Sequence, residues 1–214
     1  MCRARNVHGA LRSATASQCS RAAHALMPLA ELPLAGLHNA ANALAAGALC
    51  HAIGIADDSI VKAWRAYRGL PHRVETVAVI DGVTYYDDSK GTNVGSTVAA
   101  LNGFAQPVVL IAGGEGKGQD FAPLRDPIAR HARAVVLIGR DREQFARAIE
   151  ASGVAVERAA TMDEAVQLAR TASRPGDVVL LSPACASYDM FKNYGHRGDV
   201  FAAAVKKEVA RGGC

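Results

Sequence analysis

The run PVVLIAGG, residues 107–114, decides the fold class of this chain. The five residues after its proline are all apolar, and two glycines follow them. A strand with one face in water alternates apolar and polar residues, whereas an unbroken apolar strand is typical of a parallel sheet covered on both faces. A second run of this kind, DVVLLSPA, occupies residues 177–184. We therefore predict a parallel sheet buried between helices.

Strand and helix patterns alternate from this run toward the C-terminus. The strand-like AVVLIG, residues 134–139, precedes the helical pattern REQFARAIEAS, and the alternation continues through VAVERAA and MDEAVQLARTAS to DVFAAAVKKEVARG. Thr161 and Glu164 have the spacing of a capping box at the start of one of these helices. This order predicts an α/β fold with a doubly wound, mostly parallel, Rossmann-like sheet over residues 76–214.

Toward the N-terminus the sequence changes character twice. TVAVIDGVTYYDDS, residues 76–89, predicts two short strands joined by a type I′ turn at Asp81 and Gly82. Residues 26–75 carry helical patterns instead, with one helix through LHNAANALAAGALCHAIGI ending at Gly54 and a shorter helix after it. Because two helices without a sheet bury little surface, we interpret residues 26–75 as the end of a larger domain.

Residues 1–25 form a leader of unclear origin. They contain several arginines and serines and no acidic residue, which is the composition of an organelle transit peptide. The same composition also fits a disordered leader or a start placed inside a longer gene. We expect this leader to be disordered.

The composition is that of an ordinary globular protein of one or two domains, with half of its 214 residues apolar. No uncharged apolar run reaches about eighteen residues, so we expect no transmembrane helix and no membrane insertion. The five cysteines are scattered and form no CxxC pair, which argues against a disulfide framework or a zinc site and favours a reducing, cytosolic compartment. Lysines and arginines are spread out at a net charge of +4, so we predict no nucleic-acid partner.

Three polar or glycine-rich segments follow predicted strands, where ligands bind to open parallel sheets. The first is YYDDSKGTN, residues 85–93, which offers carboxylates, an ammonium group and hydroxyls before a helix N-terminus that suits an anion. A solvated loop with Asx turns is the alternative. The second is GGEGKGQDF, residues 113–121, with Lys117 among four glycines. It is not a P-loop, because Gly118 stands where that motif has a hydroxyl, and a flexible surface turn is equally compatible.

The third segment is SPACASYDMFKN, residues 182–193. Cys185 could be a nucleophile, but no histidine base is indicated by spacing, with His196 the nearest, so we interpret it as a small buried residue. Ser182 and Ser187 lack the G-x-S-x-G elbow of serine hydrolases. We predict that the three segments converge on one crevice.

Four motifs together resemble a known family: GLPHRVE, DDSKGTNVGST, GGEGKGQDF and LLSPACASYDMFKNYGHRGDVF, in this order. They are similar to the C-terminal domain of Mur ligases, over residue 26 to the end. Within that family they most resemble the enzymes that add D-glutamate to UDP-N-acetylmuramoyl-L-alanine in peptidoglycan synthesis. The resemblance implies a bacterial, cytoplasmic enzyme that uses ATP and Mg²⁺ to form an amide bond through an acyl phosphate.

The resemblance also implies roles for individual residues. Adenine would contact Asn39 and Asn42, the ribose Asp88, and the phosphates Arg73. D-Glutamate would be held by Thr92, Lys117 and Ser187, with the backbone near Tyr194. Lys90 would support the reacting carboxylate and phosphate, so that Lys90 and Arg73 are the expected catalytic residues.

The sequence departs from the family in one respect. The P-loop, the magnesium-binding acid and the modified lysine of the central ATPase domain are not found in it. We therefore expect residues 26–75 to be the last helices of that domain and residues 76–214 to be the glutamate-binding domain. The metal ligands would then lie in a missing part, and a separate N-terminal half would be a partner, beside the two substrates. A nucleotide- or anion-binding module without catalysis, a folylpolyglutamate synthase and a hydrolase are the alternatives.

Overall fold

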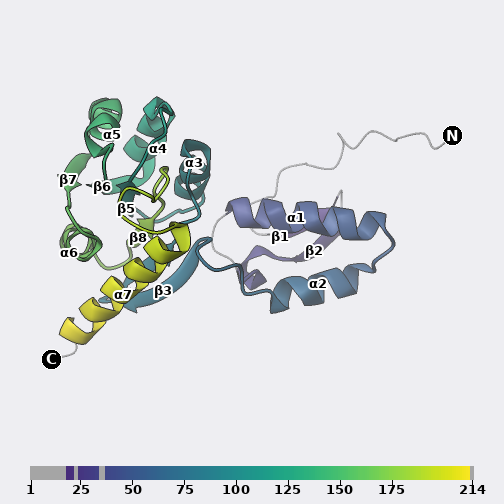
Figure 1. Cartoon of the computed structure of the whole chain (residues 1–214). Helices are drawn as coiled ribbons and strands as arrows, with labels where there is room; N and C mark the ends of the chain where they lie inside the picture. The colour runs from purple at the N-terminus through teal and green to yellow at the C-terminus, as the bar shows by residue number, and fades with distance from the viewer. Residues whose placement is uncertain (1–17, 22–23, 34–36, 213–214) are drawn as a thin grey trace. The chain divides into compact units, whose positions relative to one another are not determined.

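A computed structural model describes residues 18–21, 24–33 and 37–212 of the chain (Figure 1). The chain divides into two compact units, Met1–Gly69 and Leu70–Cys214. The division lies after Gly69, whereas the sequence placed it after residue 75. No helix among the described residues is both long and apolar enough to cross a bilayer.

The first unit contains a strand pair and two helices. Strands β1 (Gln18–Arg21) and β2 (His24–Pro28) are antiparallel, and helices α1 (Leu37–Ala52) and α2 (Asp57–Ala66) follow the short turn η2 (Leu29–Glu31). A small apolar core joins these elements, formed by Met27, Leu32, Ala40, Ile60, Val61 and Trp64. Both predicted helices are confirmed. The expectation of a disordered leader does not hold for residues 18–21 and 24–25, which pair as strands, and residues 1–17 and 22–23 lie outside the described residues.

The second unit is built on a six-stranded sheet with the order β3-β4-β8-β5-β6-β7. Only β3 and β4 pair antiparallel, and all other neighbours are parallel. The strands are β3 (Glu75–Ile80), β4 (Val83–Asp87), β5 (Val108–Gly113), β6 (Ala132–Ile138), β7 (Ala155–Arg158) and β8 (Val178–Leu181). Asp81 and Gly82 both have positive φ, as a type I′ turn requires. The mostly parallel sheet and its hairpin are therefore confirmed.

Helices cover both faces of this sheet (Figure 1). The helices are α3 (Val94–Asn102), α4 (Arg125–His131), α5 (Arg142–Ile149), α6 (Met162–Ala172) and α7 (Tyr194–Gly212), with short turns η3 (Ala122–Leu124) and η4 (Glu150–Ser152). Residues of α6 and α7 pack with Val109 and Ile111 of β5 in one core cluster, whereas α3, α4 and α5 lie toward the opposite face. All six residues of β5 are buried, as the unbroken apolar run predicts. The sheet is doubly wound.

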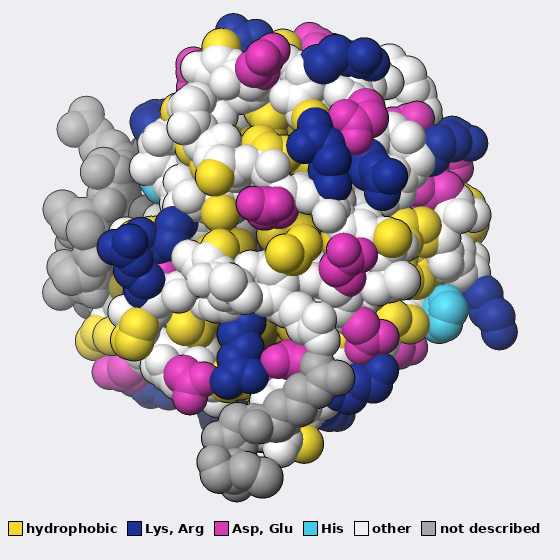
Figure 2. Space-filling view, turned by 90° about the vertical axis from the view of Figure 1, so that its left-hand side faces the viewer, with side chains coloured by type: hydrophobic (Ala, Val, Ile, Leu, Met, Phe, Trp, Pro, Cys, Tyr) yellow, Lys and Arg dark blue, Asp and Glu magenta, His cyan; other side chains and the backbone are white. Residues whose placement is uncertain are grey.

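The predicted capping box is present with one change. The Thr161 hydroxyl accepts a hydrogen bond from the Glu164 N–H at 3.2 Å, and the Glu164 carboxylate accepts from the N–H of Ala160, at 2.7 Å, one residue earlier than the motif requires. On the face drawn in Figure 2, basic and acidic side chains are interspersed, without one large patch of a single sign.

Candidate functional site

The three polar segments meet beyond the carboxyl ends of β4, β5 and β8. Backbone hydrogen bonds join them in pairs: the N–H of Ala184 donates to the carbonyl of Gly91 at 2.9 Å, and Glu115 and Ala186 exchange two such bonds at 2.9 and 3.0 Å. The N–H of Gly113 donates to Pro183 at 2.9 Å. The predicted convergence of the three segments is therefore confirmed.

A buried arginine that the residue patterns did not single out lies under this site. Arg197, the fourth residue of α7, is 0 % exposed. Its guanidinium donates to the hydroxyl and the carbonyl of Ser89, both at 2.9 Å, and to the carbonyl of Cys185 at 3.1 Å. The Ser89 hydroxyl in turn donates to the carbonyl of Tyr194 at 2.7 Å. Burial lowers the pKa of Arg197 to about 10, so that the side chain remains charged at neutral pH. Arg197 thus ties the ends of β4 and β8 to α7.

Asp88, the predicted ribose ligand, is largely buried, whereas a carboxylate that binds a ribose needs an accessible oxygen. It is 7 % exposed, and its Oδ2 accepts a hydrogen bond from the Ser182 hydroxyl at 2.7 Å. Burial raises the pKa of Asp88 to about 7, although the Ser182 bond lowers it. Gly91 permits this arrangement, because a Cβ atom there would lie 2.6 Å from Asp88 Oδ2 and 2.8 Å from Ser182 Oγ.

Lys90 and Arg73, the predicted catalytic residues, belong to two segments that contact each other. The N–H of Lys90 donates to the carbonyl of His72 at 3.0 Å, and His72 directly precedes Arg73. Lys90 Nζ lies 4.1 Å from the ring centroid of Tyr194, within the range of a cation–π interaction. The Arg73 side chain is exposed. Two cationic side chains are therefore held on adjoining segments at one end of the sheet.

The predicted D-glutamate ligands also surround this crevice. Lys117 is exposed, with its Nζ 5.7 Å from the ring centroid of Tyr188, the neighbour of the buried Ser187. Gln119 accepts from the Val94 N–H at 3.1 Å and donates to the carbonyl of Ala184 at 2.6 Å, which fixes the Lys117 loop against the other two segments.

The N-terminus of α3 carries the remaining predicted D-glutamate ligand. Thr92 is half-buried and directly precedes Asn93, whose side chain caps α3 by accepting from the Ser96 N–H at 2.9 Å. Thr92 therefore stands at a helix terminus, where free N–H groups favour a carboxylate.

Two predicted adenine ligands belong to the other unit. Asn39 and Asn42 both lie in α1, where Asn39 is half-buried and Asn42 is exposed.

Cys185 is a buried packing residue. It is 1 % exposed, and burial raises the pKa of its thiol to about 12. A thiol this far from ionisation is a poor nucleophile at neutral pH. The interpretation of Cys185 as a small buried residue is therefore confirmed.

Comparison with known proteins finds close relatives. The family described as Mur ligase, glutamate ligase domain, matches residues 72–185. A protein of Nitrosomonas europaea named UDP-N-acetylmuramoylalanine--D-glutamate ligase is 60 % identical over 181 residues, which are 85 % of this chain and 38 % of that protein. A protein of the same name from Methylobacillus flagellatus is 58 % identical over 94 % of this chain and 46 % of its own length. The chain thus spans less than half the length of these relatives.

Two solved structures share the fold. UDP-N-acetylmuramate-alanine ligase of Thermotoga maritima superposes with a TM-score of 0.57 at 18 % identity, over 81 % of this chain and 39 % of that one. Folylpolyglutamate synthase of Mycobacterium tuberculosis, complexed with ADP, gives 0.58 at 19 % identity, over 83 % and 41 %. At such identities the comparison shows the arrangement of strands and helices alone.

Proposed function

Because this chain belongs to the Mur ligase family, we propose that it carries the D-glutamate-binding part of a ligase that extends UDP-N-acetylmuramoyl-L-alanine in bacterial peptidoglycan synthesis. The name shared by the relatives from Nitrosomonas europaea and Methylobacillus flagellatus supports this choice of amino acid and acceptor. The observation that carries the proposal is the convergence of three segments, with Lys90 and Lys117, beyond the carboxyl ends of three neighbouring strands.

The chemistry of the crevice suits a small dicarboxylate. D-Glutamate presents two carboxylates, which need a fixed cation and several hydrogen-bond donors. Lys117 would supply the cation, while Thr92 and Ser187 would supply hydroxyl donors. Each charge-assisted hydrogen bond contributes about 1.5–3 kcal/mol. The Gln119 bridge would keep the Lys117 loop in place, so that little ordering is needed on binding.

The described residues fit part of a nucleotide. ATP, when bound, would supply the phosphoryl group that activates the substrate carboxylate. The exposed Arg73 guanidinium would bind phosphate oxygens, and Lys90 would hold the reacting carboxylate. Asp88 is 7 % exposed, so it would accept a hydrogen bond from a ribose hydroxyl only through the small part of its carboxylate that remains accessible. Asn39 and Asn42 would contact adenine.

The same residues do not fit a magnesium site at this crevice. Mg²⁺ prefers several carboxylate, phosphate or water oxygens in octahedral geometry. Asp88 is buried and already accepts a hydrogen bond from Ser182, and Asp87 faces the imidazole of His72, a ligand that suits transition metals and not Mg²⁺. We therefore assign no magnesium ligand among them, and the metal ligands of the reaction are proposed to lie outside these residues.

D-Glutamate binding to the chain itself tests the proposal. In the amide spectrum of the ¹⁵N-labelled chain, titration with D-glutamate should shift signals of residues 87–93, 113–121 and 182–193. The enantiomer L-glutamate should shift them less, and Lys117→Ala should weaken the D-glutamate response. Equal responses to both enantiomers, or shifts confined to other residues, would contradict the assignment.

A binding module without catalysis is the second candidate. It is favoured by one observation: the motif G-x-x-x-x-G-K-[ST] occurs nowhere in the 214 residues. This candidate predicts that nucleotide or phosphate binds to the chain, but that no added protein portion produces turnover that depends on D-glutamate.

A further inference from the structure

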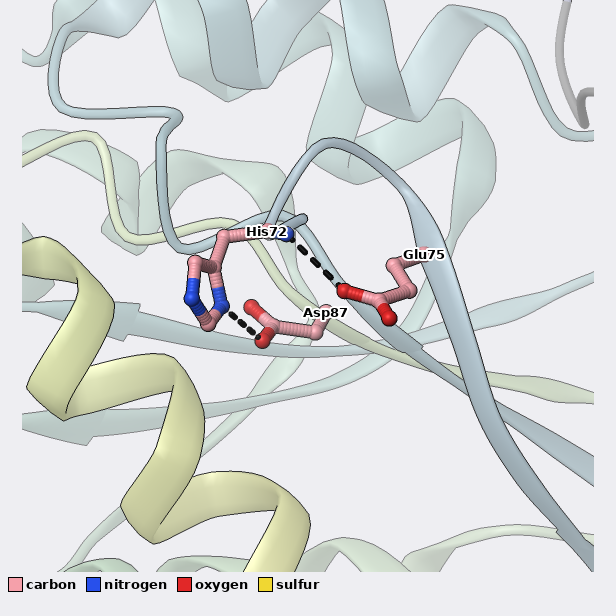
Figure 3. Close-up of side chains that lie close together, drawn as sticks. All are labelled: His72, Glu75 and Asp87. Carbon is pink, nitrogen blue, oxygen red and sulfur yellow. Dashed lines mark hydrogen bonds and ion pairs between the residues drawn. The ribbon is translucent and has the colours of Figure 1, made fainter. Parts of the chain in front are cut away.

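Three potential metal ligands lie together at the end of the antiparallel strand pair (Figure 3). Among the described residues, one ligand atom each of His72, Glu75 and Asp87 lies within 4.8 Å of the other two. His72 and Glu75 come from the segment that enters β3, and Asp87 ends β4. The three residues lie within fifteen positions of one another along the chain and form no ligand motif in the sequence.

The strand register places two carboxylates opposite each other. Glu75 and Asp87 are Cα partners in the β3–β4 ladder, so that their side chains project from the same face of the sheet. Like charges directly opposite each other destabilise an antiparallel pair. A cation between the two carboxylates would replace this repulsion with attraction.

The three side chains lie close together, and hydrogen bonds already join the three residues. Asp87 Oδ1 accepts from the Ser89 N–H at 2.8 Å, while Asp87 Oδ2 and His72 Nδ1 share a hydrogen bond of 2.7 Å that a bound ion would replace. Glu75 Oε2 accepts from the His72 backbone N–H at 3.0 Å, which leaves Oε1 available (Figure 3). Hydrogen bonds to the second oxygen of a ligating carboxylate are the arrangement that orients metal ligands in proteins.

Space for an ion and its water ligands lies beside the cluster. A surface pocket of about 310 Å³ is lined by all three side chains and by Asp199 and Lys206 of α7. Three carboxylates and one ammonium group therefore line it, an excess of negative charge that favours a cation. Helix α7 can approach because residue 198 is glycine: a Cβ atom there would overlap His72 Nδ1 and Asp87 Oδ2.

We propose that His72, Glu75 and Asp87 bind a divalent transition-metal ion, with Zn²⁺ as its representative, and that water completes the coordination. One imidazole nitrogen and two carboxylate oxygens with an open position resemble three-ligand zinc sites, and the imidazole disfavours Mg²⁺. At zinc–ligand distances of about 2.0–2.2 Å the ion would separate His72 Nδ1 from Asp87 Oδ2, and the exposed Glu75 would move to reach it. The ion would fasten the segment that carries Arg73 to the end of β4.

Metal binding by the chain alone tests this site, without nucleotide or amino acid, so that its outcome is separate from that of the proposed ligase activity. Zn²⁺ affinity is measured by competition with a chromophoric chelator, and Co²⁺ absorption reports the ligand type, because cysteine thiolates give intense charge-transfer bands that nitrogen and oxygen ligands lack. We expect one site without thiolate bands, and no displacement of Zn²⁺ by an equal concentration of Mg²⁺.

Three substitutions assign the ligands. Asp87→Asn and Glu75→Gln preserve shape and most hydrogen bonding, so the fold should persist, and His72→Ala removes the nitrogen. Since loss of a supporting contact alone costs about 10–100-fold in metal affinity, each variant should bind Zn²⁺ at least about tenfold more weakly. His131→Ala, which removes a histidine of α4, is the matched control and should bind as the parent does. Unchanged affinity in Asp87→Asn and Glu75→Gln, thiolate bands, or equal competition by Mg²⁺ would overturn the proposal.

Discussion

Replacing Arg197 tests whether the buried guanidinium holds the three strand-end segments together. Arg197→Met keeps most of the side-chain volume and removes three hydrogen-bond donors. The carbonyls of Ser89 and Cys185 and the hydroxyl of Ser89 then each lose the hydrogen bond that they accept from Arg197. A buried acceptor that loses its partner costs about 1–3 kcal/mol, so the three together cost about 6 kcal/mol. The variant also no longer buries a charge.

The stability gained by removing the buried charge can be worked out from the pKa of Arg197. Burial lowers the Arg197 pKa from 12.5 to about 10, and at about 1.4 kcal/mol for each pKa unit this is about 3 kcal/mol against the charged form. The net expectation is a loss of about 3 kcal/mol in the free energy of unfolding. With a urea m-value of about 2 kcal/mol/M, the midpoint should fall by about 1.5 M.

The assay is urea unfolding followed by far-UV circular dichroism, with two further variants. Arg158→Met removes an exposed arginine that pairs with Glu143 at 2.8 Å, and it should leave the midpoint almost unchanged. Arg197→Lys keeps the charge, but its single ammonium nitrogen cannot span the three oxygens that the guanidinium contacts through three different nitrogens, so its midpoint should lie between those of the parent and Arg197→Met. An Arg197→Met midpoint equal to that of the parent would refute the reasoning, because the three hydrogen bonds would then only balance the cost of burial.

The other predictions concern acid stability, thiol reactivity, a close glycine contact and amino-acid binding. The Arg133 hydrogen bond holds the pKa of Asp177 below its usual range, so this pair should stabilise the fold above about pH 4 and lose its effect as pH falls; Asp177→Asn should flatten the acid side of a plot of melting temperature against pH, and an unchanged acid side would contradict this. With a thiol pKa of about 12, Cys185 should resist iodoacetamide at pH 8 until urea is added, as peptide mass spectrometry would show; rapid labelling of the native chain would be the opposite result. Gly91→Ala should destabilise by about 1–3 kcal/mol in thermal or urea unfolding, whereas Gly95→Ala, where the nearest atom lies at 3.4 Å, should not; equal effects would show that the Asp88–Ser182 contact does not restrict residue 91. Lys117→Ala in an active assembly should weaken D-glutamate affinity by about 2–5 kcal/mol, and an unchanged half-saturating D-glutamate concentration would remove Lys117 from the site.

The sheet was predictable because local signals sufficed for it. Residues 108–113 are apolar without interruption and form a fully buried strand, and Asp81-Gly82 is a dipeptide that tolerates the positive φ of a tight hairpin. Two short strands near the N-terminus were missed, because neither alternating nor continuous apolar residues mark Gln18–Arg21. The pairing of β1 with β2 depends on packing within the first unit, where Met27 of β2 joins the apolar core, and not on a periodic pattern in the sequence.

The candidate site was predictable only in part. The segments after β4, β5 and β8 could be recognised, since parallel strands bring their carboxyl ends to one edge. The cluster of His72, Glu75 and Asp87 could not, because it depends on the register of β3 with β4. Arg197 could not, because its contacts depend on how closely α7 approaches the sheet. That approach is set by the small Gly198, whose importance no local pattern indicates.

The most direct test of the central claim is phosphate release from ATP in the presence of Mg²⁺, UDP-N-acetylmuramoyl-L-alanine and D-glutamate. The chain is assayed alone and mixed with a separately produced N-terminal portion of a related ligase. We predict release that requires D-glutamate, occurs only in the mixture and is lost with Lys117→Ala. Silence in the mixture, or release that is the same with and without D-glutamate, would contradict a part for this chain in the D-glutamate-adding reaction.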